Sequence, residues 1–89
     1  MALSNREKSE LRGKAQALKC SVTVGKGGLT EAVREQIRHA FAGRELVKVR
    51  IQHHERDEID RIAREIAESV PCALVARTGF TATFFQPRA

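Results

Sequence analysis

One short stretch, from Val22 to Thr30, most constrains how this chain can fold. The β-branched residues Val22 and Val24 indicate a strand with both side chains on one face. Three glycines and one lysine follow at once, in the order GKGG. Thr30 is then suited to cap a helix, because its hydroxyl can accept a hydrogen bond from an amide of the first turn. The stretch therefore predicts a strand beginning at Ser21, a glycine loop and a helix in direct succession.

Hydrophobic periodicity divides the rest of the chain into further elements. Ser4 and Glu7 have the spacing of a capping box at the start of a first helix. Gly43 is suited to end the helix that begins at Thr30, and Pro71 separates a third helix from the strand that follows it. Apart from the helix between Thr30 and Gly43, we predict helices over residues 4–18 and 57–69, and strands over residues 21–24, 45–51, 73–77 and 80–86.

These elements predict a single α/β domain over residues 1–89, in the order α-β-α-β-α-β-β. The two strand-helix-strand passages should be right-handed parallel crossovers, and the closing hairpin should add an antiparallel neighbour. We expect a two-layer arrangement, a mixed four-stranded sheet with the helices over its apolar side. Phe80, Ala82 and Phe84 should face this core. The opposite side would carry Thr23, Lys48, Arg50, Thr81 and Thr83.

The balance of charge favours a polyanionic partner. Sixteen Lys and Arg against eleven Asp and Glu give a formal net charge of +5 and a pI near 9.9. The third helix pairs opposite charges four residues apart, as at Asp60 and Arg64, so we interpret its outer face as structural. The chain has no apolar run of membrane-spanning length and no signal-peptide pattern at its start. We expect a cytoplasmic protein.

Residues suited to catalysis or metal binding are few. Cys20 and Cys72 lack CxxC spacing, and we expect both to be free, buried thiols in a reducing compartment. A cysteine could be paired with a histidine as nucleophile and base, but nothing local marks either thiol as activated. His53 and His54 are adjacent, so their side chains diverge in an extended segment, and no third metal ligand is evident. We expect no catalytic residue, no metal and no cofactor.

The glycine loop allows two interpretations. Glycines can serve only to turn the chain from strand to helix. They can also let an anion approach the backbone beside the first amides of the helix, with Lys26 as counter-charge. The spacing excludes a P-loop, because no GK[ST] is present, and a GxGxxG fingerprint, because Thr30 stands at its last glycine. What remains is a GxxG loop at Gly25 to Gly28, the form that clamps a nucleic-acid backbone in KH-type modules.

The wider pattern resembles one protein family. Leu11-Arg12 with Ala15 and Leu18, then Val24 to Thr30, then the segment RELVKV at 44–49, and finally Gly79 follow one another in the order and spacing of the CRM domain. This is the chloroplast RNA splicing and ribosome maturation domain. Residues 3–87 are similar to its stand-alone bacterial form, the YhbY-type proteins. The chain departs from the common pattern at three positions, with Gln16 and Arg44 in place of histidine and Cys20 in place of proline.

The resemblance implies a fold similar to the C-terminal domain of translation initiation factor three. It also implies binding of structured RNA and association with the precursor of the large ribosomal subunit during assembly. RNA contacts in the family are attributed to the GxxG loop and neighbouring basic residues. The candidate RNA-binding residues here are Gly25, Lys26, Gly27, Gly28, Arg12, Lys14, Lys19, Lys48 and Arg50.

Two features of the expected binding mode come from composition. With four Phe and no Trp or Tyr, the protein should recognise RNA shape and backbone more than unstacked bases. Duplex DNA is a weaker candidate, because no helix combines a basic face with base-reading side chains. The alternative is a protein-interaction module that docks on a ribosomal protein or assembly factor through the open sheet face or the third helix. We expect a monomer in either case.

Overall fold

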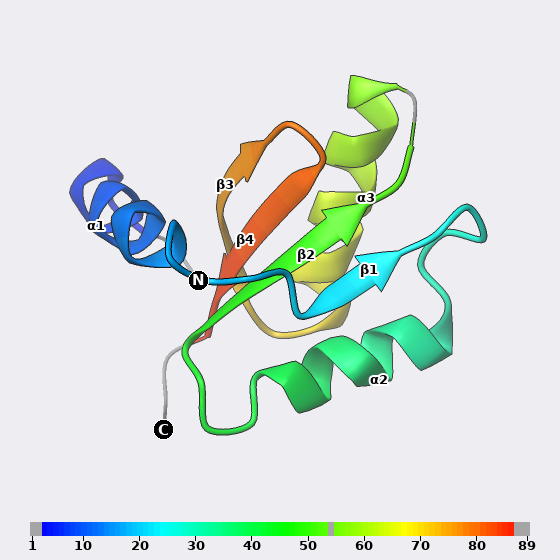
Figure 1. Ribbon diagram of the computed structural model, residues 1–89, viewed down its shortest axis with the longest axis horizontal. Coiled ribbons are helices and arrows are strands. Elements are labelled where there is room, and N and C mark those ends of the chain that lie inside the picture. The colour runs from blue at the N-terminus through cyan, green and yellow to red at the C-terminus, as the bar shows by residue number, and fades with distance from the viewer. Residues whose placement is uncertain (1–2, 54, 87–89) are drawn as a thin grey trace.

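The computed structural model describes residues 3–53 and 55–86, and its elements follow the predicted order. Figure 1 shows these elements around one twisted sheet. The predicted α/β class with a mixed four-stranded sheet is confirmed. The helices are α1 (Asn5–Ala15), α2 (Glu31–Ala40) and α3 (Arg56–Ser69), and the strands are β1 (Val22–Val24), β2 (Leu46–Ile51), β3 (Ala73–Thr78) and β4 (Thr81–Phe85).

The sheet has the strand order β1-β2-β4-β3. Strands β1 and β2 are parallel, with Val22 opposite Val49, whereas β4 is antiparallel to both of its neighbours, β2 and β3. The last strand of the chain is therefore inserted between β2 and β3. Because β1, β2 and β3 all point the same way, their carboxyl ends meet at one end of the sheet. The glycine loop, the end of β2 and the β3–β4 turn consequently lie at that end.

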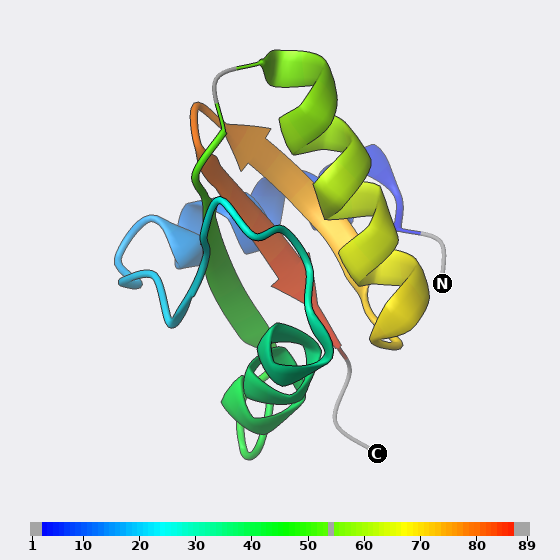
Figure 2. The ribbon, with the colours of Figure 1, turned by 90° about the vertical axis from the view of Figure 1, so that its right-hand side faces the viewer.

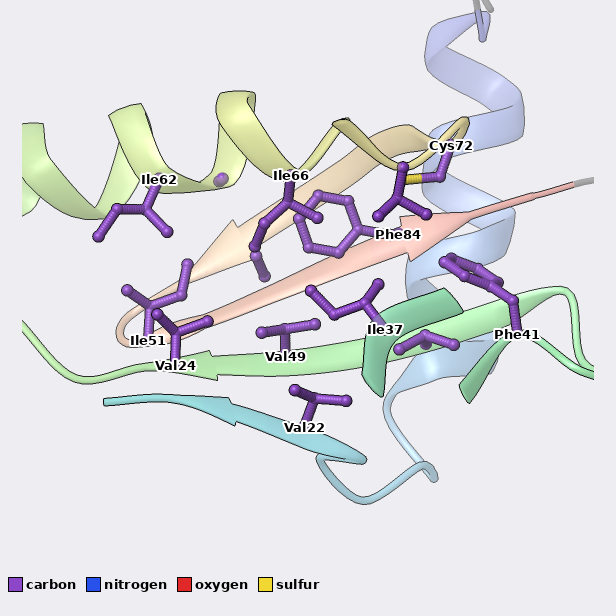
Figure 3. Close-up of a cluster of buried hydrophobic side chains, with 14 of the residues drawn as sticks. Val22, Val24, Ile37, Phe41, Val49, Ile51, Ile62, Ile66, Cys72 and Phe84 are labelled. Atoms are coloured by element: carbon purple, nitrogen blue, oxygen red, sulfur yellow. The ribbon is translucent and has the colours of Figure 1, made fainter. Parts of the chain in front are cut away.

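The main core lies between the sheet and the two helices α2 and α3. Figure 2 shows both helices on the same face of the sheet. In β2 every second side chain points toward them, which places Val49 in the centre of the cluster drawn in Figure 3. From the helices, Ile37 of α2 and Ile66 of α3 are fully buried in this cluster. The buried members from the sheet are Val22, Val24, Val47, Val49, Ile51, Ala82 and Phe84.

Helix α1 packs on the opposite face, so that helices cover both faces where two layers were expected. This face is less polar than predicted. Ala15 of α1 is buried against it, and so are Ala73 and Val75 of β3 and the side chain of Thr83. Ala73 and Val75 share this face because they are two residues apart in β3, on the opposite side of the strand from Leu74. The predicted open polar face is therefore partly covered.

Two boundaries differ from the prediction for local reasons. The capping box at Ser4 and Glu7 forms as expected, but α1 ends at Ala15 rather than at Leu18. The amide of Leu18 donates to the carbonyl of Ala15, which turns the chain toward β1. Leu18 is consequently 38% exposed and does not continue the apolar stripe. At the other end of the chain, Phe80 precedes β4 and does not face the core.

Candidate functional site

The glycine loop is an ordered turn between β1 and α2. The amide of Gly28 donates to the carbonyl of Gly25 at 3.0 Å, and Gly28 has a left-handed φ of +79° that favours glycine. Thr30 then caps α2 as predicted, because its hydroxyl accepts from the amide of Val33 at 3.2 Å. The turn leaves Lys26 and Gly27 exposed at its tip.

Two backbone hydrogen bonds hold the end of β2 between its neighbours. The amide of Gln52 donates to the carbonyl of Val24 at 2.9 Å, and the amide of Ile51 donates to the carbonyl of Phe80 at 2.7 Å. The end of β2 is thus fixed between the glycine loop and the β3–β4 turn. These segments enclose an open hollow of about 460 Å³, which we call the loop hollow. It is lined by Lys26, Arg50, Ile51, Gln52, His53 and Phe80.

Two cations on this hollow have no acidic partner in the part of the chain that the structure describes. Lys26 and Arg50 are exposed, and no carboxylate within residues 3–53 and 55–86 forms an ion pair with either. Some arginines elsewhere are neutralised: Arg61, for example, pairs with Glu58 and Glu65 at 2.5 Å. The positive charge at the loop hollow is therefore available to an anion. The structure thus brings together two of the predicted basic residues, Lys26 and Arg50.

The other predicted basic residues lie farther along the second face of the sheet. The linker from α1 crosses this face, because Cys20 contacts Thr81 at 3.9 Å and Thr81 pairs with Arg50 in the register of β2 and β4. Lys19, next to Cys20, is therefore carried toward the Arg50 side. Arg12 and Lys14 are exposed in the last turn of α1 and do not line the loop hollow.

Lys48 has a structural role that its position in the sequence did not reveal. Its ammonium group donates to the backbone carbonyl of Leu18 at 3.1 Å, and its side chain is half-buried. The amide of Ser21 donates to the carbonyl of Lys48 at 2.9 Å in the same region. Lys48 therefore holds the linker between α1 and β1 against the sheet, and its ammonium does not line the loop hollow.

Phe80, Gln52 and His53 are site residues that the sequence interpretation missed. The prediction that Phe80 shares the core face of Phe84 is wrong. Gly79 and Phe80 form a two-residue turn between paired Thr78 and Thr81, with a left-handed φ of +59° at Gly79. Phe80 is 53% exposed. A Gly-X pair between two strand-forming threonines is the sequence signal for such a turn, and it could have placed Phe80 outside the strand.

The chemistry of the remaining candidates does not favour catalysis. Burial raises the pKa of the Cys72 thiol to about 12, so Cys72 is not an activated nucleophile at neutral pH. Cys20 was expected to be buried but is exposed, because the linker that carries it runs over the surface of the sheet. Both thiols are free. No group of three potential metal ligands occurs in the described parts of the chain, and His54 lies outside them.

The helices described here are all too short or too polar to cross a membrane.

Comparison with known proteins identifies the family. The model of the CRS1/YhbY (CRM) domain matches residues 3–86. This chain belongs to the CRM domain family. A Haemophilus influenzae protein named as an RNA-binding protein is 32% identical over 85 residues, which are 96% of this chain and 86% of that protein. The Bacillus subtilis protein YqeI, named as a probable RNA-binding protein, is 30% identical over 84 residues, covering 94% and 88% of the two chains.

A solved structure shows the same CRM fold. The solution structure of a Staphylococcus aureus protein, described there as a candidate RNA-binding protein, superimposes with a TM-score of 0.89 at 26% sequence identity. The superposition covers 99% of this chain and 92% of that one. The resemblance found in the glycine loop and the RELVKV segment is thus confirmed over nearly the whole CRM domain.

Proposed function

We propose that this protein is a non-enzymatic RNA-binding protein that associates with ribosomal RNA of the large-subunit precursor and assists ribosome assembly. The observation that carries the proposal is that Lys26 of the GxxG loop and Arg50 of β2 line the same hollow at one end of the sheet, and that neither pairs with a carboxylate among residues 3–53 and 55–86. Membership of the CRM family and the names of its relatives support RNA as the partner. The protein would act as a monomer in the cytoplasm.

A phosphate at the tip of the glycine loop would be the central contact. The amide of Gly28 is committed to the turn, whereas the amides of Lys26 and Gly27 have no backbone acceptor within the described residues. Gly27 has no Cβ to obstruct an approaching oxygen, and nothing lies within 4 Å of where one would stand. The ammonium of Lys26 would donate a charge-assisted hydrogen bond to the phosphate and balance its negative charge. We therefore assign the anion contact to Lys26 and Gly27, and assign Gly25 and Gly28 to the shape of the turn.

The remaining candidate residues would extend this contact along the RNA backbone. Arg50 would hold a second phosphate across the loop hollow, with Lys19 beyond it on the linker. Arg12 and Lys14 would meet a more distant part of a structured RNA from the end of α1. Removal of any one cation that binds a phosphate should reduce the slope of log affinity against log salt by about 0.7 to 0.9.

The first test is RNA binding by charge-reversal variants across a range of salt. Transcripts of large-subunit ribosomal RNA segments would be titrated with the wild type, Lys26→Glu, Arg50→Glu and the matched control Arg64→Glu. Arg64 is exposed on α3, on the opposite face of the sheet, so its reversal makes the same change in net charge away from the site. We expect Lys26→Glu and Arg50→Glu to weaken binding and flatten its salt dependence, while Arg64→Glu does neither.

The second test concerns the ribosome. In a cell lysate fractionated on a sucrose gradient, the protein should migrate with large-subunit precursors at low salt and leave them at high salt. The alternative, docking on a ribosomal protein through α3, predicts the reverse sensitivity: Arg64→Glu would release the protein and Lys26→Glu would not. Absence from ribosomal fractions at both salt concentrations would reject the assembly role while leaving RNA binding to be decided by the titrations.

A further inference from the structure

Phe80 turns the loop hollow into a surface with both an aromatic and an ionic part. We propose that the loop hollow is a nucleobase-binding site, in which an unpaired base of the RNA stacks on Phe80 while Lys26 and Arg50 hold the neighbouring phosphates. This inference rests on the proposed RNA-binding function and adds to it a contact with single-stranded nucleotides. It departs from the expectation that the protein recognises RNA shape and backbone more than unstacked bases.

The fold does not require an aromatic residue at position 80. The hairpin turn needs a left-handed backbone only at Gly79, and Phe80 has an ordinary negative φ that any residue can adopt. Its side chain is 53% exposed and contributes nothing to the main core cluster. Only one other large hydrophobic residue in the described segments, Leu18, is comparably exposed. The ring of Phe80 is therefore available to a ligand, and a base that covers it would remove apolar surface from water.

The backbone that carries the ring is held in place by the sheet. The carbonyl of Phe80 accepts the amide of Ile51 at 2.7 Å, and the turn is closed by the pairing of Thr78 with Thr81. Arg77 also donates to the carbonyl of Gly79 at 2.9 Å. Because the backbone at Phe80 is tied to the sheet, the point from which the ring projects is set without a ligand.

The groups around the ring match a nucleotide better than they match an apolar protein segment. Lys26 and Arg50 lie on the same hollow as Phe80 and have no acidic partner among the described residues. A ligand with a flat aromatic part and flanking negative charges satisfies all three residues at once. The exposed amide of Gln52 lines the same hollow and can donate to and accept from the edge of a base. An unpaired nucleotide has this combination of groups, whereas a fully paired duplex keeps its bases stacked.

The experiment compares two RNA probes and three variants. One probe is a short single-stranded oligoribonucleotide of mixed sequence, and the other is the same sequence paired within a hairpin stem. The variants are Phe80→Ala, Phe80→Trp and Lys26→Glu, with unfolding curves as the check on folding. Since the chain has no Trp and no Tyr, the indole of Phe80→Trp is a unique fluorescent reporter of the hollow.

The outcomes separate this inference from the proposed function. We expect Phe80→Ala to weaken binding of the single strand by about 5- to 150-fold, which is the usual effect of removing one stacked aromatic ring, and to leave the stem unaffected. Phe80→Trp should retain affinity, and its emission should be quenched by the single strand. Unchanged single-strand binding by Phe80→Ala with unchanged Trp emission, while Lys26→Glu still weakens both probes, would overturn the base site alone. Failure of both probes to bind the wild type would overturn the proposed function itself.

Discussion

The ammonium group of Lys48 donates a hydrogen bond to the backbone carbonyl of Leu18, 3.1 Å away and 30 residues earlier in the chain. This bond ties the segment after α1 to the central strand β2. It lies beside the hydrogen bond from the amide of Ser21 to the carbonyl of Lys48. The linker that carries Lys19 is therefore placed by β2, and its position does not depend on a bound ligand.

Replacement of Lys48 by Met should lower the free energy of unfolding by about 0.5–1.5 kcal/mol, because the half-buried side chain no longer donates to the carbonyl of Leu18. Urea denaturation measures the change, and Lys14→Met on exposed α1 is the control for loss of a positive charge. Faster hydrogen exchange at the amide of Ser21 should accompany the loss. If stability is unchanged and RNA affinity falls as far as in Lys26→Glu, Lys48 belongs to the RNA interface instead.

Two adjacent glycines in the loop should respond differently to alanine. Gly28→Ala should cost about 1–2 kcal/mol, because its φ of +79° strains any side chain even though no atom obstructs the new Cβ. Gly27→Ala should leave stability almost unchanged, since its backbone lies outside the left-handed region and the space around it is open. Thermal unfolding of the two variants measures the difference. Equal costs would mean that the turn differs from the one described.

The two thiols should differ sharply in reactivity. Cys20 is exposed and should react promptly with an aromatic disulfide reagent at mildly alkaline pH. Cys72 is 8% exposed, and burial raises its pKa to about 12, so its reaction should wait for unfolding. In Cys20→Ser the fast phase of the thiol reaction should disappear. In the wild type, adding denaturant should make Cys72 react rapidly as well. Two fast phases in the native protein would contradict the burial of Cys72.

Acid should destabilise the protein partly through Glu58. The hydrogen bond from Arg61 holds the pKa of this carboxyl below its ordinary value of 4.5, with further contributions from the charges of Arg61 and His53. A lowered pKa in the folded state means that Glu58 adds stability above about pH 4.5 and that this contribution is lost as the pH falls below it. Glu58→Gln should therefore show a shallower loss of stability in acid. Chemical denaturation across this pH range measures it.

The control for Glu58 is Glu68→Gln. Glu68 is exposed on the same helix, and no basic side chain in the described portion of the protein pairs with it. Its replacement should leave the loss of stability in acid the same as in the wild type. Identical profiles for both variants would show that the Arg61 contact has no effect on stability in solution.

Much of the fold could be predicted because its signals are local. The alternation at Val47, Val49 and Ile51 indicates the core face of β2, and the helical spacing in α3 indicates its buried residues. The placement of α1 could not be predicted, because its short apolar stripe fits either face of a sheet. In the structure α1 packs on the face of the sheet where Ala73 and Val75 of β3 are buried.

The candidate site could be predicted only in part for a similar reason. The glycine loop and Lys26 are contiguous in sequence, so their proximity needed no tertiary information. Lys48 and Arg50 are two residues apart and lie on the same face of β2. The sequence gives no reason to assign them different roles. The two roles differ because the linker passes over Lys48, whose ammonium donates to the carbonyl of Leu18, and leaves Arg50 exposed. The ion pair of Asp60 with Arg77, in place of the predicted partner Arg64, is another contact between distant segments.

The two-residue turn at Gly79 and Phe80 bears on how such domains diversify. Its backbone depends on the glycine alone, so the side chain that follows can change without a penalty to the sheet. A single substitution at position 80 would then exchange an aromatic platform for a charged or small group beside an unchanged glycine loop. Under the proposed base site, such a change would alter the contact with the nucleotide while the folded protein is preserved.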